Sequence, residues 1–61
     1  MKHSAELRKL LSKIRELLDN KEVATDDIHK LSLIELDITI NLLSPTEEDI
    51  EYINNLYSKY F

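Results

Sequence analysis

The chain has 61 residues, a formal net charge of −4 at pH 7, and neither glycine nor cysteine. A domain of this size buries only about 60% of the surface that its unfolded chain exposes, so its stability is marginal without further support. The absence of cysteine excludes disulfides and thiolate zinc sites as that support. No apolar run approaches the roughly 18–20 residues that a membrane span needs. We therefore expect one domain over residues 1–61, cytoplasmic and without membrane contact.

The charges are unevenly distributed along the sequence. Residues 1–22 carry six lysines and arginines against four aspartates and glutamates, a net charge of +2. Residues 23–61 carry two basic residues against eight acidic ones, a net charge of −6. This asymmetry fits a basic first helix lying against an acidic remainder, and it equally fits an acidic surface for a basic partner.

The first expected helix covers about residues 4–20, with Ser4 as its N-cap. Its apolar residues fall within an arc of about 120° on a helical projection, which predicts a single core face. They are Leu7, Leu10, Leu11, Ile14, Leu17 and Leu18. The pattern ends at Asp19-Asn20-Lys21, where asparagine tolerates the left-handed conformation of a helix terminus.

The second expected helix covers about residues 26–43 and has two candidate starts. Thr25-Asp26-Asp27 offers an N-cap and two carboxylates for the positive end of the helix dipole. Ser32-Leu33-Ile34-Glu35 has the spacing of a second capping box. The segment is therefore either one continuous helix or two helical pieces broken near residues 31–32.

The segment 34–42 alternates strictly between apolar and polar residues, as a half-buried strand does. Wound as a helix, the same region has two apolar stripes on nearly opposite sides. One stripe comprises Leu31, Ile34, Ile38 and Leu42, and the other comprises Leu33, Leu36, Ile40 and Leu43. A lone strand would leave its backbone groups unpaired unless another chain supplied a second strand, so helix is the favoured interpretation. Two stripes need two contact partners: the two neighbouring helices, or a second copy of the chain.

The third expected helix covers about residues 45–60. Ser44 is the expected N-cap, Pro45 the first helical residue, and Glu47 the residue that closes a capping box. The expected core face comprises Ile50, Ile53, Leu56, Tyr57 and Tyr60, with Phe61 at its edge. Tyr52 falls outside this face.

No residue pattern predicts catalysis. The serines have no histidine at a motif spacing, and without glycine there is no loop to hold a phosphate. His29 and Asp26 share a helical turn, but two side chains alone do not predict a metal site. We expect no catalytic, metal-binding or cofactor-binding residues and no cofactor. Nucleic-acid binding is disfavoured because the isoelectric point is near 5.0.

The residues best suited to contact another protein come from three features: the second apolar stripe, an acidic cluster and one tyrosine. Tyrosine is enriched at binding hot spots, and Tyr52 lies outside the predicted core face. The candidate interface comprises Leu36, Ile40, Leu43, Tyr52, Glu47, Glu48, Asp49 and Glu51. The acidic cluster also has a structural explanation, since carboxylates stabilise the first turn of a helix.

Part of the chain resembles a known family. Leu7-Arg8-Lys9, a loop, Leu31-Ser32, and Glu35-Leu36-Asp37 with Ile40 resemble the small sporulation-control phosphatases that remove phosphate from an aspartyl-phosphate on response regulators. That family is a two-helix hairpin with a Ser-Gln-Glu-Leu-Asp signature in its second helix. Here Leu33-Ile34 separates the serine from Glu35, there is no glutamine, and residues 45–60 have no counterpart. The resemblance implies Asp37 and Glu35 as the residues to test for this activity.

The sequence thus predicts an all-α fold of three helices. This is a small three-helix bundle, or a helical hairpin plus a third helix, either closed on itself or completed by homodimerisation. The function we expect is non-enzymatic protein–protein interaction, as a regulator or antagonist that occupies a partner protein's surface. The alternatives are the aspartyl-phosphate phosphatase and a nucleic-acid-associated accessory protein.

Overall fold

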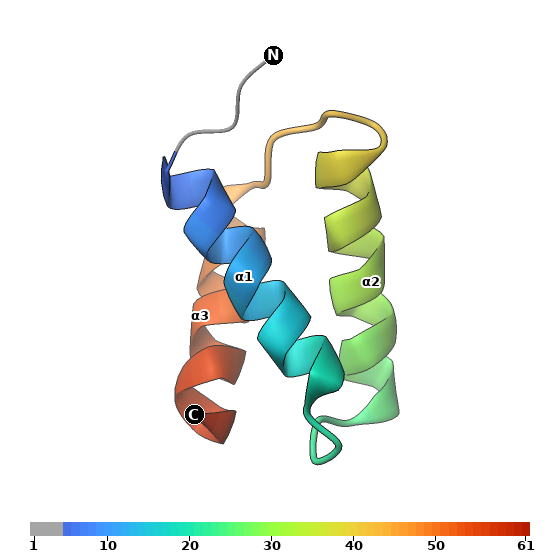
Figure 1. Ribbon diagram of the computed structural model, residues 1–61, viewed down its shortest axis with the longest axis vertical. Coiled ribbons are helices and arrows are strands. Elements are labelled where there is room, and N and C mark those ends of the chain that lie inside the picture. Colours follow the sequence, from blue (N-terminus) through green and yellow to red (C-terminus); the bar gives the residue numbers. More distant parts are fainter. Residues whose placement is uncertain (1–4) are drawn as a thin grey trace.

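The computed structural model describes residues 5–61 and consists of three α-helices (Figure 1). They are α1 (Ala5–Asp19), α2 (Thr25–Thr39) and α3 (Glu47–Tyr60), and successive helices run in opposite directions. Among residues 5–61 there is no strand, which confirms the all-α prediction and makes the strand interpretation of 34–42 wrong. The proposed Ser4 cap lies outside the described residues.

Helix α1 is the centre of the packing, because it contacts both α2 and α3 extensively while those two contact each other only weakly. Figure 1 shows α1 crossing in front of α3, with α2 beside it. Its broad apolar arc suits this position: Ile14 and Leu17 have no exposed surface, and Leu10 and Leu11 are buried beside them. Of the two ways in which the two stripes of α2 were expected to be covered, the one that places α2 between both neighbouring helices is therefore wrong, because α3 packs on α1 and barely contacts α2.

The core is built from one apolar stripe of each helix. Helix α2 contributes Leu31, Ile34 and Ile38, and α3 contributes Ile53 and Leu56. Val23, in the loop between α1 and α2, closes one end of this core. Leu31, Ile38 and Ile53 are at most 1% exposed, so the inner stripe of α2 is as well covered as the centre of α1.

Helix α2 is continuous through Ser32, so no break occurs near residues 31–32. The predicted capping box at Ser32 does not form, because an N-cap needs an extended backbone and Ser32 has helical neighbours on both sides. The helix begins instead at Thr25, preceded by Ala24 in an extended conformation without a side-chain cap. Asp26 and Asp27 occupy its first turn, where the helix dipole favours them.

Helix α2 ends at Thr39 and not at residue 43 as predicted. The Asn41 amide donates to the Leu36 carbonyl at 3.2 Å, and the Leu43 amide donates to the Asp37 carbonyl at 2.8 Å. Between them Leu42 has a φ of 56°, the left-handed conformation that glycine normally supplies at helix ends. This chain has no glycine, so a bulky leucine takes the conformation at a cost of roughly 1–2 kcal/mol.

Helix α3 begins at Glu47, with Thr46 as its N-cap, so the prediction of Ser44 as cap and Pro45 as first helical residue is wrong. The Thr46 hydroxyl accepts from the Asp49 amide at 3.1 Å, and the Asp49 carboxylate accepts from the Thr46 amide at 3.4 Å. The sequence offers two overlapping boxes, Ser-x-x-Glu and Thr-x-x-Asp. The second one forms because Thr46 is itself extended and keeps Pro45 outside the helix.

The two stripes of α2 predict opposite outcomes for two neighbouring isoleucines. Ile38 is 1% exposed and Ile40 is 69% exposed. We expect Ile38→Ala to cost about 2–5 kcal/mol and to unfold most of the protein, because it leaves a cavity in the core. Ile40→Ala should change the free energy of unfolding by less than about 0.5 kcal/mol, as surface substitutions do. Urea titration followed by circular dichroism measures both, and equal destabilisation would contradict the assignment of the stripes.

The start of α3 can be tested by removing one hydroxyl at a time. Thr46→Ala should destabilise the protein by about 1 kcal/mol, because the Asp49 amide loses its acceptor. Ser44→Ala, two residues earlier, should leave the melting temperature unchanged. A larger effect at Ser44 than at Thr46 would place the helix start where the sequence alone suggested it.

Candidate functional site

Four apolar side chains form a stripe on the side of α2 that faces away from α1. We call Leu33, Leu36, Ile40 and Leu43 the outer stripe. Their side chains are between 49% and 69% exposed. At 3.6 residues per turn the first three lie along one line of the helix, and Leu43 follows in the loop after its end. Both Leu33 and Leu36 belong to the described helix, so their exposure is a property of its face and not of a frayed end.

The outer stripe is exposed because of how the helices are arranged. The inner stripe of α2, with Ile34 and Ile38, turns toward α1 and the core. Helix α3 also packs on α1 and barely reaches α2, so it cannot cover the opposite side of α2. The prediction of two stripes is thus correct in its periodicity, while the expected second helical neighbour is missing from this chain's own fold.

Leu42 enlarges the apolar surface beyond the predicted residues. It was expected on the inner stripe, but its side chain is 60% exposed in the loop between α2 and α3. Its placement follows from the end of α2 at Thr39 and from its own left-handed backbone. The sequence offered no direct sign of this, because only an asparagine or glycine normally indicates such a turn.

Acidic residues lie on and after the apolar segment. Residues 31–58 contain no lysine, arginine or histidine, and they contain six acidic residues. Of the predicted acidic cluster, Glu47, Glu48 and Glu51 are exposed, whereas Asp49 is half-buried and closes the capping box of α3. The cluster therefore has a structural role at Asp49, and its other three carboxylates stay open to solvent.

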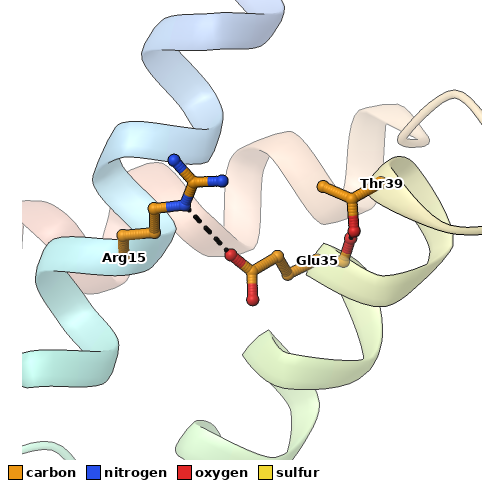
Figure 2. A network of polar contacts seen from close by, with 3 residues as sticks. All are labelled: Arg15, Glu35 and Thr39. Atoms are coloured by element: carbon orange, nitrogen blue, oxygen red, sulfur yellow. Dashed lines mark hydrogen bonds and ion pairs between the residues drawn. The ribbon is translucent and has the colours of Figure 1, made fainter.

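Glu35 and Asp37, the two residues implied by the phosphatase resemblance, lie in different surroundings. The Arg15 Nε donates to Glu35 at 3.2 Å, which ties α1 to α2, and Thr39 sits one turn further along α2 (Figure 2). The Thr39 hydroxyl donates to the Glu35 carbonyl at 2.8 Å. Asp37 is exposed, and its carboxylate accepts from the Asn41 side chain at 3.1 Å. The two carboxylates therefore leave α2 in different directions and do not form one site.

Tyr52 joins α3 to the beginning of α2. Its hydroxyl donates to the Asp27 carboxylate at 2.5 Å, and the Lys30 ammonium lies 4.3 Å from the centre of its ring. Burial of the hydroxyl, together with this hydrogen bond, raises the pKa of Tyr52 far above its ordinary value of 10.0. The candidate interface residue is thus half-buried and engaged within the chain, at the opposite end of α2 from Ile40.

Contacts between α1 and α3 use the polar residues beside the core. The Lys13 ammonium donates to Asn54 at 2.7 Å, and the Tyr57 hydroxyl donates to Glu16 at 3.1 Å. The hydrogen bond to Glu16 raises the pKa of Tyr57, which is partly buried against the core. Together with the Arg15–Glu35 pair, these contacts agree with the interpretation that the basic residues of the first helix contact the other two helices.

The described part of the chain shows no cluster of three or more histidine, cysteine, aspartate or glutamate side chains that could hold a metal ion. His29 and Asp26 are both exposed on the first turns of α2. Over residues 5–61 no helix is both long and apolar enough to cross a membrane.

The Tyr52–Asp27 contact predicts a loss of stability in alkali. The pKa of Tyr52 is higher in the folded than in the unfolded protein. The folded state therefore holds this proton when the unfolded state has lost it, and stability falls as the pH rises above about 10. We expect Tyr52→Phe to unfold with a weaker pH dependence between pH 9 and 11 in denaturant titrations. Tyr57→Phe on the same helix is the comparison: the pKa of Tyr57 is also raised, first by its surface hydrogen bond to Glu16, whereas burial leads the rise for Tyr52, so Tyr57→Phe should change the pH dependence less. An identical pH dependence in the parent and Tyr52→Phe would contradict the assignment.

Comparison of the chain with protein-family models, curated proteins and solved structures found no match. Its function is therefore inferred from its own surface.

Proposed function

We propose that this chain is a non-enzymatic helical module for protein–protein interaction, which acts by occupying a surface on a partner protein. One observation carries the proposal: the outer stripe is an apolar helix face that the fold leaves uncovered. Its residues lie on a helix whose other side is fixed in the core. The stripe is thus presented on a rigid support, which lowers the entropic cost of binding.

The spacing of the outer stripe suits recognition by a groove. Leu33, Leu36 and Ile40 stand at positions i, i+3 and i+7, the spacing with which an amphipathic helix lies in an apolar groove of its partner. A contiguous apolar surface of a few hundred Å² is at the upper end of what small monomers expose, and larger patches mark interaction sites. Five large side chains in residues 33–43, each about half or more exposed, make such a surface on a very small protein.

The fold does not need these residues to be apolar. None of the outer-stripe residues belongs to the buried core or to the side chains packed directly against it. A leucine on the solvent side of a helix contributes little to stability, and polar residues there would improve solubility. This supports a role in binding for the outer stripe, with the exposed Glu47, Glu48 and Glu51 available to steer a basic partner surface.

The proposal is tested with single substitutions that spare the fold. Once a partner has been captured and purified, its affinity is measured by calorimetry for the parent, Leu36→Ser, Ile40→Ser and Phe61→Ser. Phe61 is the matched control, because it is 62% exposed and caps the end of α3, outside the outer stripe. We expect Leu36→Ser and Ile40→Ser each to weaken binding by about tenfold or more, and Phe61→Ser to leave it unchanged. Unchanged affinity in both stripe variants would overturn the proposal.

The competing enzymatic interpretation has its own outcome in the same set of proteins. If the chain were an aspartyl-phosphate phosphatase, the parent would accelerate phosphate loss from a phosphorylated response regulator and Asp37→Asn would abolish that activity. Asp37 is exposed and lies outside the core, so this substitution leaves the fold intact. Detection of the activity, with its loss in Asp37→Asn, would replace the binding proposal by the catalytic one.

A further inference from the structure

We propose that residues 40–43 are a conformational switch at the end of α2, set by the length of the connection to α3. In the form described above they leave the helix through a left-handed turn at Leu42. In the second form they continue α2 by one more turn. This switch is a property of the chain without a partner and so goes beyond the proposed function, although the second form also lengthens the outer stripe.

The left-handed turn is disfavoured by the residues that form it. Leu42 has a φ of 56°, and a residue with a Cβ atom resists this conformation. The turn also leaves Ile40, Leu42 and Leu43 largely exposed. Residues 40–43 contain neither glycine nor proline, so no residue type in them marks the end of a helix in the usual way. The end of α2 at Thr39 therefore has a cause outside these four residues.

The apolar pattern of α2 continues through the segment that now forms the turn. On a helical projection Leu42 follows Ile38 on the inner stripe, and Leu43 follows Ile40 on the outer stripe. In the described form this register is lost, because Leu42 turns the chain out of the helix. One more turn of helix places both leucines on the stripes that their spacing assigns to them.

The backbone hydrogen bonds of the two forms differ mainly in their acceptors. The Asn41 amide donates to the Leu36 carbonyl at 3.2 Å, and the Leu43 amide donates to the Asp37 carbonyl at 2.8 Å. In a continued α-helix the acceptors lie four residues earlier, at Asp37 for Asn41 and at Thr39 for Leu43. The side-chain hydrogen bond from Asn41 to Asp37 has the i,i+4 spacing of a helix, so it fits both forms. Both amides thus have a backbone acceptor in either form.

The connection to α3 favours the left-handed turn. Residues 40–46 join the two helices, and Figure 1 shows this connection crossing the end of the bundle from α2 to α3. A residue spans about 1.5 Å in a helix and up to about 3.3 Å in an extended chain, so winding of residues 40–43 shortens the reach of the connection. Pro45 limits the extra turn, because it disfavours helical backbone at Ser44. Docking of α3 on α1 consequently opposes the second form.

The experiment lengthens the connection in the full chain. Insertion of Gly-Ser-Gly-Ser between Ser44 and Pro45 supplies a flexible segment, so α3 can dock without the reach of residues 40–43. We expect residues 40–43 to become helical in the main form of the inserted protein. Their Cα chemical shifts and amide hydrogen exchange, measured by NMR in the parent and in the inserted protein, report this change.

Two substitutions of Leu42 in the inserted protein separate the backbone from the side chain. Leu42→Gly should lower the ratio of helix to turn at residues 40–43 by about tenfold or more, because glycine accepts the left-handed conformation and disfavours helix. Leu42→Ala is the matched control: it removes the same side chain beyond the Cβ atom and should keep the segment helical. Without the insertion, Leu42→Gly should raise the melting temperature and Leu42→Ala should not.

Two results would overturn the inference: residues 40–43 that stay non-helical in the inserted protein, or equal helicity of this segment in the glycine and alanine variants. Either result leaves the proposed function standing, because partner binding is measured separately by calorimetry. Conversely, unchanged partner affinity in the outer-stripe variants would remove the proposed function and leave the switch intact, since the chemical shifts are measured on the protein alone.

Discussion

The structure depends on the burial of α1 on two sides. Ile14 and Leu17 have no exposed surface, because α2 packs against one flank of α1 and α3 against the other. For a chain of 61 residues without disulfides, nearly all folding free energy has to come from such apolar contacts. The polar contacts between helices, Arg15 with Glu35 and Lys13 with Asn54, lie at the margins of this core and orient the helices on it.

The central position of α1 also decides what is left uncovered. Because α2 and α3 contact each other only weakly, each of them has one face on α1 and one face toward solvent. On α3 the solvent face is mostly polar and carries Glu48 and Glu51, although Ile50, expected in the core, is 38% exposed. On α2 the solvent face carries Leu33, Leu36 and Ile40, and the binding proposal rests on this exposed apolar face.

Periodicity predicted the helices and most of the core. The single arc of α1 and the inner stripe of α2 followed from the 3.6-residue repeat, because burial depends on the angular position of each residue around its helix. The helix ends were less predictable. Ser-x-x-Glu and Thr-x-x-Asp compete at residues 44–49, and the choice of Thr46 depends on the path of the whole loop. The end of α2 depends on a leucine in a conformation that its residue type disfavours.

The candidate site shows the same division. Its apolar part is predictable, because the helical period places Leu36, Ile40 and Leu43 on the second of two apolar stripes. The exposure of Leu42 is not predictable from the sequence, because no residue pattern indicates a helix end at Thr39. Tyr52 lies outside the predicted core face, and in the structure its hydroxyl links α3 to α2 by a hydrogen bond. The acceptor of this hydrogen bond is Asp27, which comes close to Tyr52 only when α2 and α3 are packed together.

The unequal connections between the helices have a consequence for the order of folding. Helices α1 and α2 are joined by five residues, whereas α3 reaches α1 only across the whole of α2. Closing a short loop costs less chain entropy and takes less time than closing a long one. We therefore expect the α1–α2 hairpin to form first, with α3 docking last onto the flank of α1 that is still open. During that interval the flank of α1 that later receives α3 stays open, while the outer stripe of α2 is exposed both before and after α3 docks.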